Sequence, residues 1–183
     1  MSRETELLAG VRIATSSPDK SIRATYEFGK NIALSGDPEK IRNHSDTDFA
    51  SEMSRALNGL LSGFRQARHM AVEKTYGKLP DKPQNASAAA VVADQEDLKR
   101  ELSDIEVTGS SPDGLIYIGL RPAHGFDVRL EESATVRFGG KTLLESANAA
   151  LRQTLLEYNR AVADVRKNRY QRLLAHRRTS HVR

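Results

Sequence analysis

A tetrapeptide that occurs twice constrains the fold of this chain more than any other feature. Ser-Ser-Pro-Asp stands at residues 16–19 and again at 110–113, 94 residues later. At this offset the apolar positions of residues 11–70 stay in register with the later segment without a gap, although only nine residues are identical. Internal repeats of this kind indicate a structural unit that is used more than once. We therefore predict one small domain written twice in tandem.

The composition is that of an ordinary globular protein. Charged residues make up 28% and apolar residues 38% of the 183 residues, and there is no tryptophan. Each repeat offers about 60–70 ordered residues, a size at which a single core provides little net stability. The two units are therefore expected to pack on each other or on another copy.

The residue usage also predicts a cytoplasmic location. The sequence has no cysteine, which excludes disulfides and thiolate metal sites and fits a reducing compartment. No apolar run approaches the roughly twenty residues that a membrane span requires. None follows the first four residues as a secretion signal would. We expect neither a membrane partner nor export.

Three segments of the second repeat alternate apolar and polar residues, which is typical of strands with one buried face. Short connections at 110–114 and 122–125 join these segments and favour an antiparallel meander. The apolar members are Ile105 and Val107 in the first segment, Ile116, Ile118 and Leu120 in the second, and Phe126, Val128 and Leu130 in the third.

The repeated tetrapeptide has the chemistry of a tight turn. Pro112 fixes the backbone of the first corner, Asp113 suits the second, and Gly114 accepts a positive φ. Lys20 stands where the second repeat has Gly114. The first turn is therefore predicted to be looser or of another type.

Each repeat ends in an apolar seam with helical spacing. The later seam predicts a helix from about 142 to 174, roughly 50 Å long, so part of it must project beyond a three-stranded sheet or meet another helix. The earlier seam runs from Phe49 to Ala67 after cap candidates at 45–48. Gly59 and Gly63 lie inside the earlier seam, where they indicate either close helix–helix contact or mere tolerance. The later seam comprises Leu144, Ala147, Leu151, Leu155, Tyr158, Val162 and Val165.

Together these patterns predict an α+β fold of two tandem units, each a three-stranded antiparallel sheet with a long C-terminal helix. A further helix is expected over 88–103, before the second sheet, where the first unit has only a stub at 4–8. The predicted parts are a divergent first unit at 1–77, a proline-containing linker at 78–87, the second unit at 88–165 and a basic helical tail at 166–183.

The segment from Leu98 to Ile118, LKRELSDIEVTGSSPDGLIYI, resembles the YbaB/EbfC family of bacterial nucleoid-associated proteins. That family has a leading helix, a hairpin marked by Val-Thr-Gly and a following glycine, a third strand and a long final helix. Residues 88–165 fit this pattern throughout. Residues 4–76 fit with a truncated leading helix and with Ile13-Ala14-Thr15 in place of Val-Thr-Gly.

Family members are typically small homodimers with a tweezer-like shape, and several bind DNA with little sequence preference. The resemblance therefore implies a tandem version whose two units form a pseudo-dimer within one chain, located at the nucleoid. Some actinobacterial relatives are thought to act as protein partners in specialised secretion. The resemblance thus also implies an alternative, a protein–protein adaptor without DNA binding.

A basic tail is the main functional signal that does not depend on the resemblance. Residues 164–183 carry seven basic and one acidic side chain, whereas the rest of the chain is slightly acidic. Arginine-rich stretches bind phosphate backbones by charge neutralisation and counterion release. A solvated cationic helix end, which complements the helix dipole, or docking to an acidic protein are the alternatives. The candidate DNA-binding residues are Arg166, Lys167, Arg169, Arg172, Arg177, Arg178 and Arg183, with a weaker set, Arg65, Arg68 and Lys74, at the corresponding end of the first long helix.

Catalysis and metal binding have little support in the sequence. The histidines lack metal-ligand spacing, and no phosphate-binding glycine loop, HExxH motif or nucleophile elbow occurs. We expect no enzyme activity, no cofactor and no metal. The predicted function is low-specificity binding of double-stranded DNA by a nucleoid-associated or accessory regulatory protein, with self-association or a protein partner as further interactions. The histidines are His44, His69, His124, His176 and His181.

Overall fold

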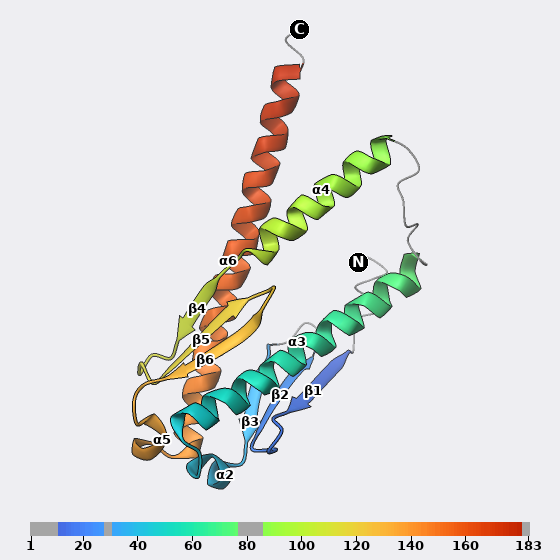
Figure 1. Ribbon diagram of the computed structural model, residues 1–183. Helices are drawn as coiled ribbons and strands as arrows, with labels where there is room; N and C mark the ends of the chain where they lie inside the picture. Colours follow the sequence, from blue (N-terminus) through green and yellow to red (C-terminus); the bar gives the residue numbers. More distant parts are fainter. Residues whose placement is uncertain (1–10, 28–30, 77–85, 181–183) are drawn as a thin grey trace.

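The computed structural model describes residues 11–27, 31–76 and 86–180, with side chains described up to Lys74 in the first long helix, from Ala93 in the next and up to Arg172 in the last. It contains two three-stranded antiparallel sheets (Figure 1), which confirms the predicted α+β class and both meanders. The first sheet comprises β1 (Arg12–Ser16), β2 (Ile22–Glu27) and β3 (Ala33–Gly36), and the second β4 (Val107–Ser110), β5 (Ile116–Arg121) and β6 (Gly125–Leu130).

Two long helices follow the sheets, as predicted. They are α3 (Asp46–Tyr76) and α6 (Gly140–Ser180), and α6 extends past both predicted ends to 41 residues, or about 60 Å. Its second half projects beyond the sheets (Figure 1). The helix before the second sheet is α4 (Ala86–Ser103), so the last two residues of the predicted linker are helical. The rest of that linker and the stub at 4–8 lie outside the described residues.

Two short helices were not predicted. They are α2 (Pro38–Arg42) and α5 (Ala134–Arg137), and each precedes a long helix. Asp37 caps α2, because its carboxylate accepts a hydrogen bond from the Glu39 amide. Ser45 caps α3 in the predicted way, since its Oγ accepts the Asp48 amide at 3.1 Å and donates to the Asp48 carboxylate at 2.6 Å. None of the described helices combines the length and apolarity needed to cross a bilayer.

The repeated tetrapeptide forms the same hydrogen-bonded turn in both units. Ser17 Oγ donates to Asp19 Oδ1 at 2.6 Å, and Ser111 Oγ donates to Asp113 Oδ1 at 2.5 Å. Each serine Oγ also accepts the amide of the isoleucine five residues later at 3.0 Å. The sequence repeat is therefore a structural repeat at this turn.

The prediction of a looser first turn was wrong. Lys20 adopts φ 60°, close to the 71° of Gly114, and both amides donate to a serine carbonyl at 2.9 Å. The surrounding hydrogen bonds hold Lys20 in the left-handed region despite its Cβ, which costs an L-residue about 1–2 kcal/mol.

We expect Lys20→Gly to stabilise the protein by about 0.5–1 kcal/mol, because glycine removes the left-handed strain but adds freedom to the unfolded chain. Urea denaturation measures this change. Lys40→Gly, on an exposed position of helix α2, is the control and should destabilise by about 1 kcal/mol. A Lys20→Gly protein no more stable than wild type would show that the first turn carries no such strain.

The long helices join the two units, because each packs on strands of both sheets. Helix α3 packs on β1 and β2 of its own unit and on β6 of the other, and α6 packs on β4 and β5 and on β3. A single hydrophobic core runs through both units as a result. Its fully buried large residues include Ile22, Ile41, Phe49, Met53, Leu57, Ile116, Ile118, Leu143 and Leu151.

Two asparagines bind the strand edges of the opposite unit. Asn58 of α3 accepts the Phe126 amide at 2.7 Å and donates to the Phe126 carbonyl at 3.0 Å. Asn148 of α6 does the same to Leu34, with both distances at 2.9 Å. Each side chain satisfies one donor and one acceptor that the edge strand would otherwise leave without a partner.

Close approach between helix and sheet is achieved differently in the two units. Gly59 and Gly63 let α3 lie against β1, where their nearest neighbours are Thr15 and Ile13, so they serve a helix–sheet contact and not a helix–helix contact. In the second unit the glycine is on the strand. There Gly109 faces Thr154 of α6. Thr15 donates to the Ala56 carbonyl at 2.6 Å, and Thr154 donates to the Ala150 and Ile118 carbonyls at 2.9 Å.

Candidate nucleic-acid interface

The distal half of α6 holds the main predicted cations. Arg166 and Lys167 are exposed and form no ion pair with any described residue. By their numbers they belong to the second half of α6, and that half of the helix projects beyond the sheets (Figure 1). Arg177 and Arg178 belong to the last turns of α6, whose side chains lie outside the description, and Arg183 lies outside the described residues altogether.

Arg169 and Arg172 are engaged by carboxylates of α4. The Arg169 guanidinium donates to the carboxylate and to the main-chain carbonyl of Asp94, and its side chain is only 13% exposed. It also lies 3.9 Å from Glu101. Arg172 donates to both carboxylate oxygens of Glu101, at 2.7 and 3.0 Å. Two of the seven predicted tail residues are thus paired with acids.

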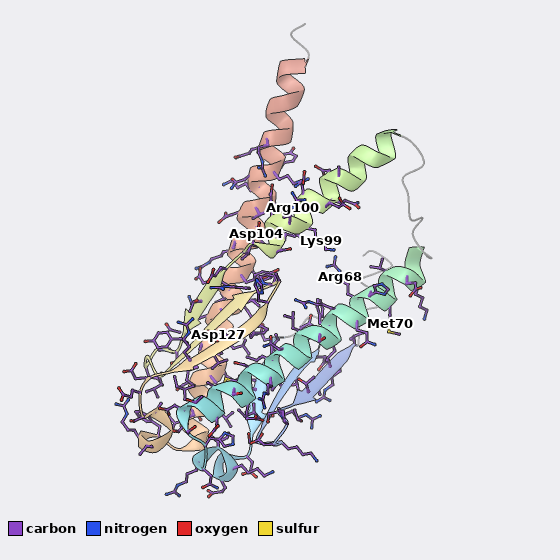
Figure 2. All side chains as sticks on the ribbon, viewed as in Figure 1. Arg68, Met70, Lys99, Arg100, Asp104 and Asp127 are labelled. Atoms are coloured by element: carbon purple, nitrogen blue, oxygen red, sulfur yellow. The ribbon has the colours of Figure 1, made fainter. Side chains whose placement is uncertain are left out.

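The weaker predicted set lies on the distal part of α3. Lys74 is exposed, whereas the Arg65 guanidinium donates to the Pro122 carbonyl in the turn between β5 and β6. Arg68 is exposed, and in the view of Figure 2 it extends from α3 toward α4. The set therefore occupies a second projecting helix, separate from the basic end of α6 (Figure 1).

Sequence reasoning missed two cations on α4. Lys99 and Arg100 are exposed, and Figure 2 shows them on α4 above the space that separates it from α3. Arg100 lies 3.6 Å from Asp97 in an exposed pair. The signal was present in the sequence as adjacent basic residues within a predicted helix, but helical periodicity did not show which side of α4 would meet α6.

An apolar pocket of about 290 Å³ lies between α3 and α6. Tyr26 and Phe64 meet edge to face in its wall, with ring centroids 5.5 Å apart. Most of the lining residues occupy equivalent positions of the two repeats. Both units therefore contribute matching side chains to the pocket wall. These pairs are Tyr26 and Leu120, Ile32 and Phe126, Leu61 and Leu155, and Phe64 and Tyr158.

Asp19 and Asp113, the aspartates of the two repeated turns, have lowered pKa values because hydrogen bonds stabilise their ionised forms. Partial burial disfavours ionisation of Asp19, but hydrogen bonds from Ser17 and Ser21 outweigh it and lower the pKa of this carboxyl well below its ordinary range. At Asp113, burial is likewise outweighed by hydrogen bonds from Ser111 and Ser146, so its pKa is lowered too. Such groups stay ionised near neutral pH, which suits turn stabilisation and does not suit a general acid.

The described histidines do not form a metal site. His44 lies 2.8 Å from Asp19, next to the first repeated turn, and His69 and His124 are exposed. Within the described ranges no group of three histidine, aspartate or glutamate side chains could hold a metal ion. His176 falls in the last turns of α6, without a described side chain, and His181 lies outside the described residues.

No protein-family model, curated protein or solved structure matches this chain. The candidate interface therefore rests on geometry alone: exposed cations lie on the long helices, and the bases of those helices pack in a shared core.

Proposed function

We propose that this protein binds double-stranded DNA with little sequence preference, through phosphate contacts from the projecting ends of α6 and α3. The observation that carries the proposal is the exposure of Arg166 and Lys167 on a helix that extends beyond the sheets, within a stretch of net charge +6. Cations spaced along a rod can follow a phosphate backbone, and they supply no base-reading surface.

The arrangement of the two units supports a tandem version of the YbaB/EbfC architecture. Two meander sheets with long final helices share one core, and the helices diverge from it. In this proposal the pseudo-dimer replaces the homodimer of the family. The exposed ends of α3 and α6 then act as the two arms of the tweezer, each with its own cations.

The test is the replacement of the exposed α6 cations. We expect Arg166→Gln with Lys167→Gln to weaken binding to a random duplex about tenfold at 50 mM salt and to lower the salt slope by about 1.8, because two phosphate contacts are lost. Fluorescence anisotropy between 50 and 200 mM salt measures both quantities.

A matched control is available on α2, at the opposite end of the molecule (Figure 1). Lys40→Gln with Arg42→Gln removes the same two charges from exposed positions and should change binding less than about twofold. Equal losses in both double variants would mean that only net charge matters. No binding of wild type at 50 mM salt would reject the proposed function.

The apolar pocket favours a second function, the protein–protein adaptor. A cavity lined by aliphatic and aromatic residues can accept apolar side chains of a partner. If this function holds, Leu155→Glu in the pocket should abolish capture of a partner, whereas Leu156→Glu should not, because Leu156 is 53% exposed and is not part of the pocket lining. DNA binding should be unaffected by either change.

A further inference from the structure

Helix α4 covers part of the proposed DNA-binding end of α6 with carboxylates. Asp94 and Glu101 are seven residues apart, two helical turns, and therefore lie on one side of α4. They engage Arg169 and Arg172, which are one turn apart on α6. The carboxylates thus occupy guanidinium groups in the way that phosphate oxygens would.

Among the described side chains, ion pairs from Asp94 and Glu101 connect α4 to α6. Among the described residues of α4, from Ala93 to Ser103, none is buried, and only Leu98, Glu101, Leu102 and Ser103 are half-buried. Helices α3 and α6, by contrast, each contribute fully buried residues to the core. The pair of Arg172 with Glu101 lies near the surface, where ion pairs contribute little net stability and weaken as salt screens them. Arg169 is more buried, so its pair with Asp94 is screened less. Helix α4 can therefore leave α6 without opening the core.

We infer that α4 is a built-in competitor of DNA, and that its carboxylates must leave Arg169 and Arg172 before phosphates can bind these arginines. This inference rests on the proposed function and adds its regulation. Binding then exchanges two intramolecular ion pairs for two phosphate contacts. Any factor that draws α4 away from α6 increases the affinity for DNA.

The experiment removes the competing charges and leaves the arginines in place. We expect Asp94→Asn with Glu101→Gln to bind a random 20-base-pair duplex about tenfold more tightly than wild type at 50 mM salt, with a salt slope steeper by up to about 1.8. The control is Glu96→Gln with Glu145→Gln, which makes the same change in net charge at exposed positions that form no described ion pair. It should tighten binding less than about threefold.

Three outcomes are distinguishable. If wild type binds DNA and both double variants tighten binding equally, the competition by α4 is rejected while the proposed function stands. If no protein binds DNA, including Asp94→Asn with Glu101→Gln, both are rejected. If wild type binds DNA and only the Asp94→Asn with Glu101→Gln protein binds more tightly, the competition is supported.

A second readout follows α4 directly. The chain has no cysteine, so Ala93→Cys and Asn168→Cys place two spin labels at exposed positions of α4 and α6. We expect the distance distribution between the labels to lengthen and broaden when the duplex is added at 50 mM salt. An unchanged distribution in the DNA-bound protein would contradict the release of α4.

Discussion

Gly109→Ala should lower the free energy of unfolding by about 2–3 kcal/mol, because α6 leaves no room for a side chain at this position of β4. An added Cβ would lie 2.6 Å from Thr154 Oγ1 and 2.7 Å from the Ala150 carbonyl oxygen. One of these neighbours is helix backbone, which cannot rotate away as a flexible side chain can. Urea denaturation measures the change, with the slope of the transition checked against wild type.

Gly119→Ala is the matched control on the adjacent strand. An added Cβ there would meet nothing nearer than 3.8 Å, so the substitution should leave stability within about 0.5 kcal/mol of wild type or increase it. Similar losses at Gly109 and Gly119 would show that glycine itself, and not the contact between β4 and α6, determines the effect.

Loss of the inter-unit asparagines should have the largest effect on stability. Asn58→Leu leaves the Phe126 amide and carbonyl without their partner, and Asn148→Leu does the same at Leu34. Unsatisfied buried backbone groups cost about 1–3 kcal/mol each. The two groups that either substitution leaves unpaired are only partly buried, so we expect the low end, about 2–3 kcal/mol for the pair. The double variant should lose about 5 kcal/mol, enough to unfold a domain of ordinary stability.

Thermal and urea unfolding of the two single variants and the double variant give the measurement. Asn168→Leu, at an exposed position of α6 without a hydrogen bond to any described residue, serves as the control and should stay within about 0.5 kcal/mol of wild type. Single variants as stable as this control would mean that the edge strands do not need the asparagines.

The secondary structure was largely predictable because its determinants are local. The alternation of Ile116, Ile118 and Leu120 predicted β5, and these residues are buried as the period requires. The seam through Leu151 predicted the long helix in the same way. The cap at Ser45 was visible as a polar cluster before an apolar run.

The small size of each repeat predicted that the units would pack on each other or on another copy, and they pack on each other. The way they join was not predictable, because no local pattern shows which sheet a helix will cover. The asparagines illustrate the difficulty. At the repeat offset of 94, Asn58 corresponds to Arg152, which lies four positions, or about 6 Å along the helix, after Asn148. At the same offset, Phe126, the partner of Asn58, corresponds to Ile32. Asn148 instead binds Leu34, two residues or about 6.6 Å further along the strand. The repeat alignment alone therefore does not reveal the pairing.

Side-chain pairing was the other part that the sequence did not show. Arg169 and Arg172 belong to the same basic run as Arg166, and only the packing of α4 on α6 separates them. The conformation of Lys20 is similar, since a residue with an ordinary preference for negative φ is held at φ 60° by the turn around it. Packing between helices decided the first, and hydrogen bonds within the turn decided the second.

The joining of the two units into one cooperative core is tested most directly by native-state hydrogen exchange at two equivalent amides. Ala24 and Ile118 lie at matching positions of the middle strands β2 and β5, and both are fully buried. If one core holds both sheets, the two amides should exchange through the same global opening, with free energies within about 0.5 kcal/mol of each other at every urea concentration. Exchange of Ala24 through an opening several kcal/mol cheaper, while Ile118 stays protected, would show that the sheets unfold separately.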